Sequence, residues 1–152
     1  MKRLIAAATK GDPDAEYNLG VMYDNRIDDH GNAIDPTDDN GNPIASNRTE
    51  AMKWLRRAAE HGQPRAQMRL AELYAAGTSA HRNYGRACQW FIVAIHGLNG
   101  VHRQRARDGY DGVRSQLTTA EMLAAERRAR DWERRRRAAT PAPAPTPLRA
   151  TQ

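Results

Sequence analysis

The fold of this chain is decided by residues 51–77, AMKWLRRAAEHGQPRAQMRLAELYAAG. Small and apolar residues recur there at steps of three and four, the period of one helix face, in two runs. The first run comprises Ala51, Trp54, Leu55, Ala58 and Ala59, and the second comprises Ala66, Leu70, Leu73 and Tyr74. Between the runs, Gly62 suits the left-handed conformation that ends a helix, and Pro64 suits the first turn of the next helix. The stretch therefore predicts a helical hairpin.

Parts of this hairpin recur elsewhere in the chain. A shift of 51 residues toward the N-terminus places Ala58, Gly62 and Tyr74 on Ala7, Gly11 and Tyr23. A shift of 36 residues toward the C-terminus places Ala51, Trp54 and Ala58 on Ala87, Trp90 and Ala94. One period of about 36 residues, with 15 residues inserted before Ala51, explains both shifts. Helix pairs repeated at this length predict an α-solenoid, because one pair cannot bury its apolar face alone.

These spacings carry a resemblance to a known family. The pattern Ala15-x-x-x-Leu19-Gly20-x-x-Tyr23, followed by Ala51-x-x-Trp54-x-x-x-Ala58-Ala59-x-x-Gly62, resembles the Sel1-like repeat, a relative of the tetratricopeptide repeat. A second copy begins at Ala66 and continues through Ala87 and Trp90. The resemblance implies a right-handed superhelix of antiparallel helix pairs that serves as a protein-interaction scaffold.

We therefore expect an all-α chain with one short solenoid over residues 1–137 and capping helices at both ends. Its expected parts are an N-terminal half-repeat cap (1–11), a repeat (12–62) with an insertion at about 24–47, a second repeat (63–97), and a degenerate repeat with a capping helix (98–137). Thr118 and Glu121 predict a capping box for that last helix. Gly109 and Gly112 do not fix the residue at which the preceding helix ends. The Pro- and Ala-rich residues 138–152 are expected to form a disordered tail.

The insertion is acidic. Residues 24–50 hold seven acidic and two basic residues, whereas the whole chain has a formal net charge of +6. A ten-residue duplication places Asp28 and Asp29 in register with Asp38 and Asp39, and the Gly-containing turns predict a hairpin-like excursion. No oxygen ligands alternate in the EF-hand manner, so we predict no metal site. The insertion is then a solvated loop or a contact for a basic partner.

No catalytic signature or cofactor motif is found, so we predict neither an enzyme nor a cofactor. The single cysteine, Cys88, excludes an internal disulfide and is expected to be a buried small residue in a reducing compartment. The apolar run near the N-terminus is too short for a signal peptide, and no stretch reaches membrane-spanning length. These features favour a cytoplasmic protein.

The first function hypothesis is a scaffold that binds a peptide or partner protein in the groove of the repeats. The groove is expected to lie along the first helix of each pair, and its predicted residues are Tyr17, Val21, Asp24, Met68, Glu72, Arg103, Arg107 and Tyr110. Such a lining suits apolar anchors and acidic groups. The alternative for several of these side chains is packing between repeats.

The second function hypothesis is binding of nucleic acid or another anionic surface by the basic C-terminal half. The basic residues there are Arg127, Arg128, Arg130 and the run 134–137. Glu121, Glu126, Asp131 and Glu133 are interleaved at spacings that permit pairs within the helix, which favours a solvated helix end instead.

Overall fold

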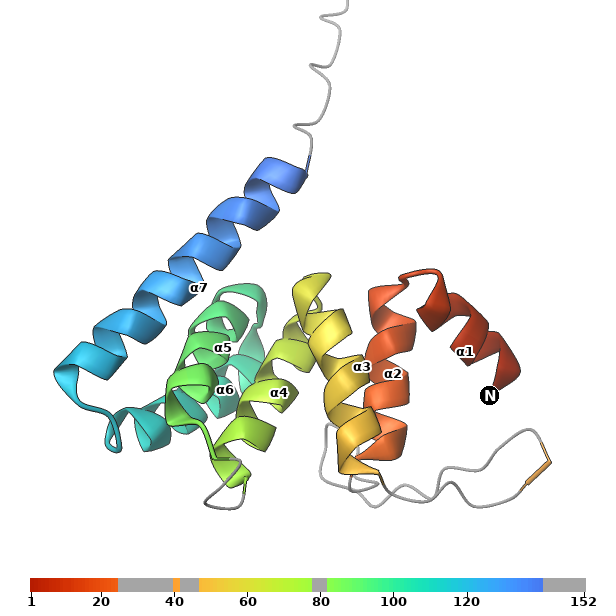
Figure 1. Cartoon of the computed structure of the whole chain (residues 1–152), viewed down its shortest axis with the longest axis horizontal. Coiled ribbons are helices and arrows are strands. Elements are labelled where there is room, and N and C mark those ends of the chain that lie inside the picture. Colours follow the sequence, from red (N-terminus) through yellow and green to blue (C-terminus); the bar gives the residue numbers. More distant parts are fainter. Residues whose placement is uncertain (25–39, 42–46, 78–81, 141–152) are drawn as a thin grey trace, which may run out of the picture.

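The computed structural model describes residues 1–24, 40–41, 47–77 and 82–140, and these residues form α-helices and no strand. The helices, in order, are α1 (Lys2–Thr9), α2 (Pro13–Tyr23), α3 (Arg48–Glu60), α4 (Pro64–Ala76), α5 (Tyr84–Gly97), α6 (Gly100–Arg114) and α7 (Thr119–Ala139). They form a short α-solenoid, which confirms the predicted fold class (Figure 1).

Side-chain caps begin most of these helices, namely α2, α3, α4, α5 and α7. The Asp12 carboxylate accepts hydrogen bonds from the Asp14 and Ala15 amides, at 3.0 and 3.1 Å. The capping box of Thr118 and Glu121 at the start of α7 is confirmed. Because the capping groups satisfy amides that have no partner inside the helix, they fix the points at which the helices begin.

The helices lie in two layers. Each helix from α1 to α5 packs against the next, and across the repeats α2 contacts α4 and α4 contacts α6. One layer is therefore made of α2, α4 and α6, and the other of α1, α3 and α5.

The turn between α3 and α4 depends on Gly62, whose φ of 88° is the left-handed conformation that the sequence predicted.

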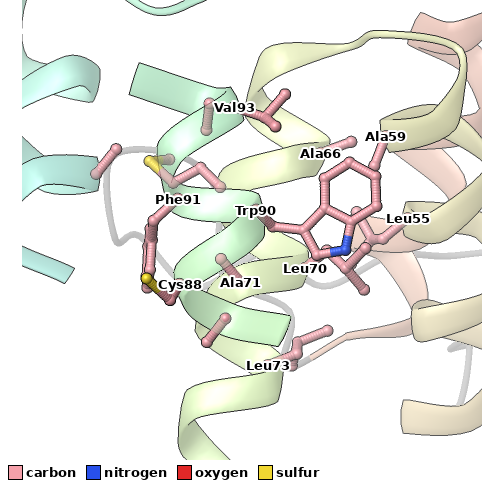
Figure 2. Close-up of a cluster of buried hydrophobic side chains, with 14 of the residues drawn as sticks. Leu55, Ala59, Ala66, Leu70, Ala71, Leu73, Cys88, Trp90, Phe91 and Val93 are labelled. Carbon is pink, nitrogen blue, oxygen red and sulfur yellow. The ribbon is translucent and has the colours of Figure 1, made fainter. Parts of the chain in front are cut away.

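The core lies between these layers and is centred on α5. Figure 2 shows the Trp90 ring lying among Leu55, Ala59 and Leu70, while Phe91 points to another side of α5. All five side chains are buried. Small residues between the large ones allow the helices to approach closely, which is how an alanine-rich chain reaches native packing density.

The last helix, α7, packs against α5. Its Trp132 ring meets Trp90 edge to face, with 5.7 Å between the ring centroids and an interplanar angle of 70°. The indole Nε1 also donates a hydrogen bond to Glu60 Oε2 on α3, at 2.8 Å. The helix continues to Ala139, two residues beyond the predicted end at 137.

Candidate functional site

A cavity of about 510 Å³ lies between α4 and α6, and α5 also contributes to its wall. Its lining combines small side chains with aromatic and aliphatic ones. The lining residues are Glu72, Ala75 and Ala76 from α4, Tyr84 and Phe91 from α5, Gly109, Gly112 and Val113 from α6, and Gln116 after α6. The volume lies within the range of ligand-binding pockets, and mostly apolar walls are typical of them.

Two glycines in α6 shape this cavity in different ways. A Cβ atom built at Gly109 would lie 2.4 Å from the Phe91 ring, so the absence of a side chain lets α6 approach α5. A Cβ atom built at Gly112 would meet no atom within 4 Å, so that position faces open space. Gly109 therefore serves the packing of α6, and Gly112 leaves the cavity open.

A second pocket, of about 470 Å³, adjoins the first because Tyr84 and Gln116 line both. Two of its lining side chains are the guanidinium groups of Arg82 and Arg128. Arg82 lies over the Tyr84 ring, 5.7 Å from its centroid. The buried Nε of Arg128 has no hydrogen-bond partner among the described residues.

This second pocket also contains the Glu121 carboxylate. The backbone amide and the hydroxyl of Thr118 both donate to it at 2.8 Å, and these hydrogen bonds lower the pKa of Glu121. The carboxylate is therefore ionised at neutral pH and already engaged. With two guanidinium groups against one carboxylate, the pocket keeps a net positive charge.

A chain of ion pairs crosses the layer of α2, α4 and α6 beside the cavity. The guanidinium of Arg69 lies 3.0 Å from Asp24 Oδ2 and 3.3 Å from Glu72 Oε2. Arg105 on α6 donates to both oxygens of Glu72, at 2.7 and 3.0 Å. The contact between Asp24 and Arg69 is short but is not aligned as a hydrogen bond, so its attraction is mainly coulombic. These pairs hold the three helices in register.

The structure corrects the expected position of four predicted groove residues. Tyr17, Val21 and Met68 are buried in the core, and Asp24 is buried in its ion pair with Arg69. Their side chains pack between helices, which is the alternative that the sequence left open. The reason is that the solenoid is short and tightly packed, so these positions of α2 and α4 turn into the core instead of an open groove.

Of the predicted residues nearer the cavity, Glu72 lies on α4, whereas Arg103, Arg107 and Tyr110 share one face of α6. Glu72 lines the cavity, but Arg103 donates to the Leu98 carbonyl at 2.6 Å, and Arg107 is exposed. Tyr110 is half-buried, and this burial raises the pKa of its phenol. None of these three α6 residues lines the cavity; Gly109, Gly112 and Val113 do. A pair of glycines three residues apart inside a helix was the signal that could have identified that face.

The predicted loop residues Asp28, Asp29, Asp38 and Asp39 lie outside the described residues. Within the described part of the chain, no group of three or more acidic, histidine or cysteine side chains is placed to hold a metal ion. No helix among the described residues is long and apolar enough to cross a membrane.

The thiol of Cys88 is buried on α5, as the sequence predicted. Burial raises the pKa of this thiol to about 11, and the Glu126 carboxylate adds to the effect. The thiolate is the nucleophilic form of cysteine, so Cys88 is unreactive at neutral pH.

Comparison with known proteins identifies the repeats. The Sel1 repeat family model matches residues 13–29, 39–63 and 64–96. A search of curated proteins found no match. The match to the family model ends at α5, so the cavity lies where the last matched repeat meets α6.

Two solved structures are similar to the chain. The first is c5321, a protective antigen of uropathogenic Escherichia coli with an SLR fold. It has a TM-score of 0.65 and 22% identity, over 97% of this chain and 29% of that one. The second, a Sel1 repeat protein from Oxalobacter formigenes, has a TM-score of 0.49 and 26% identity, over 86% of this chain and 97% of that one. The first structure shares the fold, and the matches to the family model, which extend from residue 13 to residue 96, show that the chain belongs to the Sel1 repeat family.

Proposed function

We propose that the chain is a non-catalytic scaffold that binds a segment of a partner protein in the cavity between α4 and α6. Sel1 repeats generally serve as protein-interaction scaffolds, which supports the class of function. The observation that carries the site is the open apolar cavity itself, with Gly112 facing empty space in its wall.

The walls of the cavity define the side chain that would enter it. The accessible apolar surface comes mainly from Ala75, Ala76 and the Tyr84 ring, since Phe91 and Val113 are almost fully buried, and the small alanines leave room for a large side chain. The one carboxylate in the lining, Glu72, is already paired with Arg69 and Arg105, so it does not present a free charge to an entering group. The entering group is therefore an aliphatic or aromatic side chain, which is the kind of anchor that dominates binding energy at protein interfaces.

The adjoining pocket adds a charge preference. Arg82 and Arg128 lie beyond Tyr84, on the side toward the start of α7. A partner segment that places an apolar side chain in the cavity would bring a neighbouring residue to these guanidinium groups. An acidic side chain or a C-terminal carboxylate complements them, because arginine donates paired hydrogen bonds to carboxylates. The proposed partner is thus a segment with an apolar anchor beside a carboxylate.

A cytoplasmic setting is part of the proposal. It is supported by the lone cysteine, which cannot form a disulfide within the chain, and by the burial of its thiol.

The proposal is tested by filling the cavity. Peptides that bind the wild-type chain are selected from a random displayed library, and their affinities are measured by fluorescence anisotropy. Gly112→Leu adds a side chain where open space exists, so it should obstruct the cavity while the chain stays folded. The control is Gln104→Leu, which adds the same side chain to an exposed position of α6 that does not line the cavity.

We expect the selected peptides to share an apolar residue next to an acidic one, and to lose at least tenfold in affinity with Gly112→Leu alone. Circular dichroism confirms that both variants fold. Equal affinities for the wild type and Gly112→Leu would refute the proposed site, as would peptides that lack an apolar residue. Loss of the acidic preference in Arg128→Gln would support the second half of the proposal.

A further inference from the structure

The outward face of α7 carries a stripe of arginines that the proposed scaffold function does not use. Ala125, Ala129 and Trp132 bury the opposite face of the helix. At about 100° per residue, four arginines fall within an arc of about 80° that lies roughly 150° from this buried face. These residues, which we call the arginine stripe, are Arg127, Arg130, Arg134 and Arg137, and all are exposed.

The acidic residues of α7 do not neutralise this stripe. Glu121 is engaged by Thr118, and Glu133 pairs with His96 on α5. Glu126 is half-buried and lies close enough to Cys88 to raise the pKa of that thiol. The remaining acidic residue, Asp131, is 3.8 Å from Arg134, and both side chains are more than half exposed.

The sequence favoured a solvated helix end with intrahelical pairs. In the part of the chain that the structure describes, Asp131 and Arg134 form the one acid–arginine pair within α7, and it is a weak one. The folding of α7 onto α5 separates the charges, since Glu133 turns toward His96 and the stripe turns away. The spacing of charges in the sequence therefore predicted more pairing between the acidic residues and the arginines of α7 than the structure contains.

The chemistry of the stripe selects among the anionic partners. Four guanidinium groups span about 15 Å of helix, and each can donate two hydrogen bonds to one phosphate. A protein interface needs an apolar centre, but the one large apolar side chain exposed on α7 is Leu123, at the start of the stripe and 48% exposed. A helix that enters a membrane surface needs a free apolar face, and that face of α7 is buried on α5.

We propose that the arginine stripe of α7 binds the phosphate backbone of nucleic acid without regard to sequence. It contacts phosphates, and no side chain of the stripe is of the aromatic kind that stacks on bases. The binding is therefore dominated by the release of counterions and depends steeply on salt. None of the four stripe arginines lines the cavity or the adjoining pocket, so the stripe is a separate surface from the one that the scaffold function uses.

The test measures binding of the full chain to a fluorescent 20-base-pair DNA duplex by anisotropy, at a series of salt concentrations. Four phosphate contacts predict a slope of log K against log salt of about −3.6, and an affinity loss of roughly 100-fold between 50 and 200 mM salt. Replacing the four stripe arginines with glutamine should remove binding at 50 mM salt and flatten the slope.

A matched control variant removes the same number of positive charges from other parts of the chain. It replaces Arg3, Lys10, Lys53 and Arg107 with glutamine, and all four are exposed on other helices or turns. Since the stripe faces away from the core, both variants should keep the wild-type circular dichroism. We expect the control to retain most of the affinity, with the slope changed by less than one.

Three outcomes would overturn the proposal. The first is the absence of binding by the wild-type chain at 50 mM salt. The second is an equal loss in the stripe variant and the control, which would show an effect of net charge alone. The third is tighter binding to vesicles that contain phosphatidylserine than to the duplex, which would assign the stripe to a membrane surface.

Discussion

Gly109 and Gly112 provide a matched pair for testing how α6 is packed. Both lie inside the same helix, and both would gain a methyl group on substitution by alanine. Their surroundings differ, because a methyl at Gly109 would lie 2.4 Å from the ring of Phe91, whereas at Gly112 it would meet no atom within 4 Å. The two substitutions should therefore change the free energy of unfolding in opposite directions.

The magnitudes follow from two known effects. Alanine is favoured over glycine in a helix interior by about 0.8–1.0 kcal/mol, so Gly112→Ala should stabilise the chain by up to that amount. Gly109→Ala gains the same term but must displace Phe91, which is almost fully buried. Overpacking of this kind costs about 1–3 kcal/mol, so the net effect should lie between about 0 and 2 kcal/mol of destabilisation.

The assay is equilibrium unfolding in urea, followed by circular dichroism and by tryptophan fluorescence. The two variants should differ by about 1–3 kcal/mol, or by several degrees in midpoint temperature at about 2–4 °C per kcal/mol. Equal stabilisation of both variants would refute the close approach of α6 to α5. Destabilisation by Gly112→Ala would refute the open wall on which the proposed binding site depends.

Two further predictions concern buried charge and pH. Arg69→Met should destabilise the chain by about 3 kcal/mol in urea unfolding, because Asp24 would be left buried without its cation. Adding Asp24→Asn to this variant should recover part of the lost stability. If Arg69→Met alone lowers the free energy of unfolding by less than about 0.5 kcal/mol, the assigned ion pair is contradicted. Burial raises the pKa of Cys88 from its ordinary 9.0 to about 11, so the unfolded chain loses the proton first and stability falls as pH rises from 9 to 11. The wild type should lose about 2 kcal/mol more than Cys88→Ala across this window, and parallel pH curves would rule out the raised pKa.

The helices and their ends could be predicted because their signals are local. Gly62 and the pair of Thr118 and Glu121 act on amides or dihedral angles within a few residues, so one stretch of sequence contains the whole cause. The repeat spacing added the order of the helices, since a solenoid stacks each pair on its neighbour. Together these signals were enough to predict the fold class.

The cavity could not be predicted in the same way, because it depends on distances between helices. Met68 and Tyr17 were assigned to a groove by helix periodicity, which gives the face of a helix but not what covers that face. Gly109 and Gly112 were read as signals for the end of a helix, since glycine weakens helices locally. In α6 the contact between Gly109 and Phe91 outweighs that local cost, and the glycines become part of the cavity wall.

The two proposed surfaces share no residue, although Arg128 of the adjoining pocket and the arginine stripe both belong to α7. The cavity lies between α4 and α6, whereas α7 packs on α5 and carries its arginine stripe on the side turned away from it. A partner segment in the cavity therefore leaves the stripe free, and the same chain can hold a protein and a nucleic acid at once. If both proposals hold, the selected peptide should bind equally well with and without saturating duplex, whereas competition between them would place the two ligands on one surface.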